Sequence, residues 1–205
     1  MNHETVAARL ERTKLVTRHY HQLQGLRQIP VGLLFLTLAI DRTGWWPLFS
    51  VWQPISGILV FSLAIVGIWL AGRYYDQTIG RVTHRSSIKS KVVFVAWLAL
   101  FLAAQWVEAL WQWPVSASIL MFALMYGVGF WVTGRALHQY LAAACLLVII
   151  SLLPLTGLLT TPQLYLFGPE SAPGVALVGL IMIPVGLVDH WWLIRSLQSL
   201  REGAQ

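Results

Sequence analysis

Six apolar segments, each close to the length of a bilayer crossing, constrain this chain more than any other feature. A membrane-spanning α-helix needs roughly 20 mostly apolar residues, because each residue adds about 1.5 Å of rise. We therefore predict an all-α polytopic membrane protein whose six transmembrane helices form one domain over residues 28–195. The six segments cover residues 28–44, 51–72, 92–111, 115–133, 140–159 and 174–194.

The composition favours lipid-facing helices over a soluble core. Of the 205 residues, 57% are hydrophobic and 11% are charged, whereas soluble domains carry about 25% charged residues. The net charge of +6 does not indicate a nucleic-acid partner, because the basic residues stand in short stretches between the apolar segments. We expect the lipid bilayer as the partner and leave open a second membrane protein or a homodimer.

The same basic residues predict the orientation. With the N-terminus inside, 13 of the 14 basic residues fall in cytoplasmic segments, and Arg42 alone falls outside. Short loops rich in Lys and Arg remain on the cytoplasmic side. Both termini are therefore expected in the cytoplasm.

The region before the first span has an amphipathic pattern over residues 5–26. Val6, Leu10, Val16, Tyr20 and Leu23 recur near helical spacing, with arginines on the other side. Residues 1–27 are expected to form a helix on the inner membrane surface. A solvated helix packed on cytoplasmic loops is the alternative. Residues 196–205 are expected to be a cytoplasmic tail.

A short motif recurs where the even-numbered spans reach the cytoplasmic side. Each of these spans ends in a Trp-x-x-x-Arg pair, and the second and fourth share further residues around it. This recurrence predicts three helical hairpins in the same orientation, as parallel repeats. Positions i and i+4 share a helix face, so each arginine can lie over its tryptophan ring. The pairs are Trp69–Arg73, Trp131–Arg135 and Trp191–Arg195.

Asp189 and His190 are ionisable residues inside the sixth span. A carboxylate within a membrane costs roughly 2.5–3.5 kcal/mol on insertion scales and usually faces a partner or a polar cavity. In the repeat register, its counterparts are glycines, which would leave room for a polar cavity if the even-numbered spans meet near one axis. Pro184 is expected to bend or break the helix beside it. The hypothetical ligand or proton site comprises Asp189, His190, Gly67, Gly129, Arg73 and Arg135. A structural salt bridge from Asp189 to Arg73 or Arg135 is the alternative.

Glu108 and Arg42 lie near the outer ends of their spans and are expected to form an outer polar pair. The histidines show no metal-ligand spacing, so no metal is expected. We find no phosphate-binding glycine loop, no nucleophile elbow and no paired carboxylates at hydrolase spacing. We therefore predict no cofactor and no enzymatic activity.

Two stretches stand out, Gly72-Arg73-Tyr74-Tyr75, continuing to Ile79-Gly80-Arg81-Val82, and Gly186-Leu187-Val188-Asp189-His190, continuing to Leu193-Ile194-Arg195. With these stretches the chain resembles small bacterial integral membrane proteins of six spans that have no assigned activity. The resemblance implies a bacterial cytoplasmic membrane. It assigns no functional residue.

Three function classes follow from these observations. The first is a non-enzymatic accessory or partner module of a bacterial membrane transport system, which the short loops and few intramembrane charges favour. The second is a small transporter or channel with a polar site around Asp189. The third is an intramembrane sensor or enzyme that uses Asp189 and His190.

Overall fold

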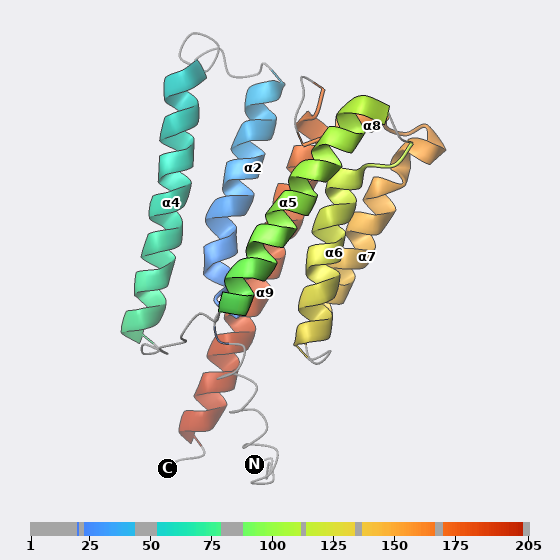
Figure 1. Cartoon of the computed structure of the whole chain (residues 1–205). Coiled ribbons are helices and arrows are strands. Elements are labelled where there is room, and N and C mark those ends of the chain that lie inside the picture. Colours follow the sequence, from blue (N-terminus) through green and yellow to red (C-terminus); the bar gives the residue numbers. More distant parts are fainter. Residues whose placement is uncertain are drawn as a thin grey trace.

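The computed structural model describes residue 20 and residues 23–43, 53–78, 88–111, 114–133, 137–166 and 170–202. This part of the chain is helical and contains no strand. In Figure 1, α4 lies at one edge, α2 lies beside it, and α6 and α7 lie at the other edge. The elements are η1 (Gly25–Arg27), α2 (Gln28–Arg42), α4 (Gln53–Thr78), α5 (Ile88–Trp111), α6 (Ala117–Val132), α7 (His138–Ser151), η2 (Leu153–Thr156), α8 (Thr161–Leu164) and α9 (Ala172–Glu202).

Each of the six predicted apolar segments coincides with a long helix, namely α2, α4, α5, α6, α7 or α9. Pro30 stands in the first turn of α2, where its missing N–H leaves no hydrogen bond unmade. The predicted amphipathic helix over residues 5–26 falls largely outside the described residues. Its last residues belong to a 3₁₀ turn, because η1 begins at Gly25.

Two pairs of glycines bring α2 and α9 into close antiparallel contact. A Cβ on Gly179 would lie 2.7 Å from the carbonyl oxygen of Gly32, and one on Gly186 would lie 2.5 Å from that of Gly25. Gly25 of η1 and Gly32 of α2 are seven residues apart, as are Gly179 and Gly186 of α9, which is about two helical turns. Small residues let helix backbones approach this closely. The α2–α9 pair therefore forms the centre of the molecule, with α4 packed against α2 and α7 against α9.

This centre corrects the expectation that the even-numbered helices meet around one axis. Gly67 of α4 packs against Pro30 of α2, and Figure 1 shows α2 beside α4 at that edge. The helix α9 is also unbroken, since it runs from Ala172 to Glu202 through Pro184. Packing against α2 on both sides of Pro184 keeps α9 helical, while the exposed proline ring faces outward. The contacts among the described residues do not test the predicted repeat of three helical hairpins, which stays a prediction.

Two helical segments in the described part of the chain are long and apolar enough to cross a membrane, Gly57–Thr78 and Ala172–Gln198. The helices α2, α6 and α7 have 15, 16 and 14 residues. They are shorter than the roughly 20 residues that one crossing needs. The structure therefore supports a helical protein with two candidate membrane spans, and six crossings remain a prediction.

Candidate functional site

Asp189 is fully buried in α9 and is the acceptor for three neutral side chains. The amide of Gln139 donates to Oδ1 at 2.7 Å. The hydroxyl of Tyr140 donates to Oδ2 at 2.9 Å, and the amide of Gln28 donates to the same oxygen at 3.3 Å. We name Asp189, Gln28, Gln139 and Tyr140 the Asp189 cluster. It joins α2, the start of α7 and α9 through side chains alone.

The donors of this cluster all point at the carboxyl oxygens of Asp189. Tyr126 of α6 donates to the Oε1 atom of Gln28 at 3.4 Å, so the NH₂ group of Gln28 is turned towards Asp189. All three neighbours therefore present protons to the carboxylate oxygens. The exposed Arg73 does not form the predicted salt bridge with Asp189, and Arg135, the other predicted partner, lies outside the described residues. The described partners of Asp189 are two amides and a phenol, which carry no positive charge.

The glycine pair nearest to Asp189 explains why this residue is buried. A Cβ on Gly25 would lie 2.6 Å from the Cβ atom of Asp189. The backbone of η1 therefore covers one side of the aspartate, and no larger residue fits there. Gly186, one turn before Asp189 on the same face of α9, also contacts Gly25.

His190 points away from this cluster and towards α4. Its Nδ1 atom lies 2.9 Å from the hydroxyl oxygen of Tyr75, which also accepts the backbone N–H of Leu26 at 3.1 Å. Donation of the phenol proton to Nδ1 satisfies all three groups and leaves the imidazole proton on Nε2. Since adjacent residues on a helix point about 100° apart, Asp189 and His190 form no dyad.

The two glycines of the predicted site lie in different surroundings. A Cβ on Gly129 would meet the ring of Tyr140 at 3.0 Å, so Gly129 gives room to a phenol that binds Asp189. Gly67 is packed against Pro30 and lies away from the cluster. The structure thus brings Gly129 and Asp189 together through Tyr140, and it places Gly67 elsewhere.

Two of the Trp-x-x-x-Arg pairs have the geometry that their spacing predicts. The guanidinium carbon of Arg73 lies 5.4 Å from the centre of the Trp69 ring, and that of Arg195 lies 5.0 Å from the centre of the Trp191 ring. Arg73 is exposed and does not reach Asp189. Arg135, the third arginine, lies outside the described residues.

Glu108 is a second buried carboxylate, at the opposite end of the helices, and it caps α6. Its Oε1 atom accepts the backbone N–H of Ser118 at 2.7 Å and the hydroxyl of Ser116 at 2.8 Å, and its Oε2 atom accepts the hydroxyl of Ser118. A carboxylate at a helix N-terminus satisfies free N–H groups and interacts favourably with the helix dipole. Glu108, Ser116 and Ser118 form what we name the Glu108 cap.

Tyr165 supports this cap from the connection that follows α8. Its hydroxyl donates to the main-chain oxygen of Glu108 at 3.0 Å. Burial raises the pKa of the Tyr165 phenol, and the Glu108 carboxylate adds to the effect, so the phenol remains a donor near neutral pH.

Arg42 binds the segment before α9 and not Glu108, so the two members of the predicted outer pair do not contact each other. Its guanidinium donates to the carbonyl oxygen of Leu166 at 2.8 Å and also to the hydroxyl of Ser171. Arg42 therefore fastens the end of α2 to the start of α9, while Glu108 is satisfied by α6.

Sequence reasoning missed the three donors of the Asp189 cluster. None of the three was among the residues expected at the site. A usable signal exists, because Gln28 begins α2, Gln139 stands in the first turn of α7, and Asp189 lies within the apolar part of α9. Polar side chains in an apolar bundle are expected to face one another.

The Asp189 carboxyl group can carry a negative charge or bind a proton or a small cation. The Glu108 cap can stabilise the start of a helix. Among the residues that the structure describes, no group of His, Cys, Asp and Glu side chains is placed to bind a metal ion. No protein-family model, curated protein or solved structure matches this chain.

Proposed function

We propose that this chain is a non-enzymatic integral membrane protein that serves as an accessory or partner module of a bacterial membrane transport system. The observation that carries the proposal is the surface of α4. This helix of 26 residues contacts the remaining described elements chiefly through α2 and η1. Its other sides are exposed and apolar, and they include Ile58, Phe61, Leu63, Val66 and Leu70.

A helix that is apolar all round is stable only inside a larger core or in lipid. The exposed apolar side chains of α4 extend along its length, so water would leave a large apolar patch uncovered. Lipid covers such a surface without cost. A second membrane helix covers it equally well, which is why α4 is also the surface we assign to a partner protein.

Exposed tryptophans support placement across a bilayer. Trp106 and Trp111 are exposed at the Glu108 end of the helices, and Trp69 and Trp191 are exposed towards the Asp189 end. Indole rings favour both interfaces of a membrane, so two such groups fit its two surfaces. The distribution of basic residues supports an orientation in which the Asp189 end, with both termini, faces the cytoplasm.

The absence of enzymatic chemistry is supported by how the two buried carboxylates are used. Asp189 is occupied by three donors from the protein, and Glu108 by the start of α6. His190 binds Tyr75 and does not meet either acid. Because these three side chains already hydrogen-bond to other groups of the protein, their contacts favour a structural role.

Reporter fusions test the topology. A reporter fused after Gln205 or near Arg85 is expected to be active in the cytoplasm, and one near Glu170 is expected to report the outside. A cytoplasmic signal near Glu170 contradicts six crossings.

Photo-crosslinking in native membranes tests the partner. A photoreactive residue at Leu63 of α4 is expected to give a discrete protein adduct that mass spectrometry identifies. The same residue at Leu124, exposed on α6, serves as the control and is expected to label lipid. Lipid adducts alone at both positions contradict the partner module.

One observation favours a second function, a small transporter with its site at Asp189. The carboxylate is fully buried and its hydrogen bonds come from neutral groups, so a bound proton or cation would neutralise it. Proteoliposomes containing the wild type or Asp189→Asn distinguish the two functions. Ion flux that the wild type supports and the variant loses favours the transporter, and flux equal to that of empty vesicles excludes it.

A further inference from the structure

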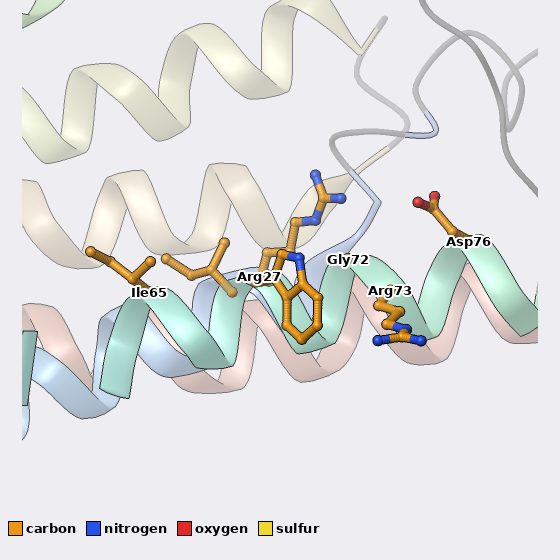
Figure 2. A pocket seen from close by; sticks show the side chains of 7 residues that line it. Arg27, Ile65, Gly72, Arg73 and Asp76 are labelled. Atoms are coloured by element: carbon orange, nitrogen blue, oxygen red, sulfur yellow. The ribbon is translucent and has the colours of Figure 1, made fainter. Parts of the chain in front are cut away.

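A groove between η1 and α4 combines apolar and cationic side chains. Its volume is about 510 Å³. Figure 2 shows Arg27 beside Gly72 on α4, Ile65 further along the same helix, and Arg73 reaching out from its other side. The lining residues are Arg27, Ile65, Ile68, Trp69, Gly72, Arg73 and Asp76.

Arg27 extends into this groove because Gly72 has no side chain. A Cβ on Gly72 would lie 2.7 Å from an Nη atom of Arg27. The Nε atom of Arg27 is buried and has no hydrogen-bond partner within the described part of the chain. A half-buried guanidinium that lines a groove is a suitable group for binding an anion through its terminal N–H groups.

The groove carries more positive than negative charge. It contains two guanidinium groups and one carboxylate, that of the exposed Asp76. Arg73 is held at the rim because its guanidinium lies 5.4 Å from the centre of the Trp69 ring. Arginine remains protonated at any physiological pH, so the excess of positive charge is permanent.

The order of these side chains along α4 matches the order of groups in a phospholipid. Ile65 and Ile68 supply an apolar surface, Trp69 follows, and the charged residues come last, towards the end of α4. From Ile65 to Gly72 the helix rises about 10 Å. A lipid phosphate next to Arg27 would therefore place an acyl chain along the isoleucines. On the proposed topology this end lies at the inner surface, where anionic lipids are found.

We propose that this groove binds one anionic phospholipid, with its phosphate at Arg27, a weaker contact to Arg73, and an acyl chain along Ile65 and Ile68. The proposal rests on membrane insertion but on neither the partner protein nor the transport context. A chain that leaves the membrane fraction without detergent contradicts insertion itself, whereas loss of lipid selectivity contradicts only this site.

Native mass spectrometry of the full-length protein from vesicles of phosphatidylcholine and phosphatidylglycerol tests the site. The wild type is expected to retain one phosphatidylglycerol. Arg27→Gln is expected to lower that adduct about tenfold and Arg73→Gln about threefold. Gly72→Leu, which changes no charge, is expected to lower it as much as Arg27→Gln, because the leucine occupies the position of the guanidinium.

Arg195→Gln is the matched control, since Arg195 lies over Trp191 in the same way but does not line the groove. Its adduct is expected to equal that of the wild type. An equal loss in Arg195→Gln and Arg27→Gln would mean general attraction between cations and anionic lipid and would overturn the site. Displacement of the lipid by excess inorganic phosphate would assign the groove to a free anion and would also overturn the proposal. Thermal unfolding of each variant shows that the fold is retained.

Discussion

The two buried carboxylates of this protein have the same chemistry and opposite surroundings. Glu108 is bound by serines 8 and 10 residues away in sequence, and one of its donors is the backbone N–H of Ser118. Asp189 is bound by side chains 49, 50 and 161 residues away. Glu108 thus closes one helical hairpin, whereas Asp189 connects three elements that are distant in the chain.

The difference shows two ways in which a protein can stabilise a buried carboxylate. At Glu108 the start of α6 provides free N–H groups and a favourable dipole, so the carboxylate stabilises a helix end. At Asp189 neutral amides and a phenol provide the hydrogen bonds, and no cation is among them. The Glu108 cap is therefore expected to be purely structural, while the neutral donors described around Asp189 leave room for function.

Removing the carboxylate of the Glu108 cap is expected to have the largest effect. Glu108→Ala leaves the backbone N–H and the hydroxyl of Ser118 buried without their acceptor, while Ser116 keeps the main-chain oxygen of Leu164. This should cost about 3–5 kcal/mol of unfolding free energy. Thermal unfolding in detergent measures the loss. Glu170→Ala, at an exposed position, is the control and should leave the unfolding temperature unchanged. A loss at Glu108 no greater than that of the control would remove the capping role.

The glycine contact beside Asp189 gives the next largest effect. In Gly186→Ala the new methyl group meets the carbonyl oxygen of Gly25, so α9 must move away from η1 and the start of α2, at a cost of about 2–3 kcal/mol. Gly57→Ala is the matched control, because nothing lies within 4 Å of a Cβ there. Chemical denaturation of both variants compares them, and equal stability would contradict the tight α2–α9 contact.

Asp189→Asn separates charge from hydrogen bonding at the other carboxylate. The asparagine amide opposes one of the three donors, which should cost about 1–2 kcal/mol of unfolding free energy. The structural interpretation expects this loss with normal partner crosslinking from Leu63. The transporter interpretation expects ion flux to vanish as well. A loss as large as that of Glu108→Ala would show that the two carboxylates do not differ in kind.

The smallest effects are expected from the two tyrosines. Tyr140→Phe removes one of three hydrogen bonds to Asp189 and should cost about 1.5 kcal/mol, since its acceptor is charged. Tyr165→Phe removes a bond to a main-chain oxygen of Glu108 and should cost about 1 kcal/mol or less. Unfolding curves of the two variants, measured side by side, test which loss of stability is larger. A larger loss in Tyr165→Phe would show that the stronger hydrogen-bond network is at Glu108.

Local patterns predicted the positions of the six long helices well, because apolar length and a proline in a first turn are properties of neighbouring residues. They also predicted that Arg73 and Arg195 lie over tryptophans four residues earlier. Arg73 does not form the salt bridge predicted for Asp189, while Arg135, the other predicted partner, lies outside the described residues. Glu108 and Arg42 bind other groups and not each other. Each carboxylate has nearer neutral donors that only the folded chain brings to it.

The sequence by itself determined where the helices lie and which of their residues are polar. Such features depend on contacts one helical turn apart, which spacing alone specifies. The tertiary structure decided which helices are neighbours, because Gly25, Gly32, Gly179 and Gly186 join α2 to α9 only when their positions along both helices match. That match places Gln28 beside Asp189, 161 residues away, and so creates a site that no local pattern could specify.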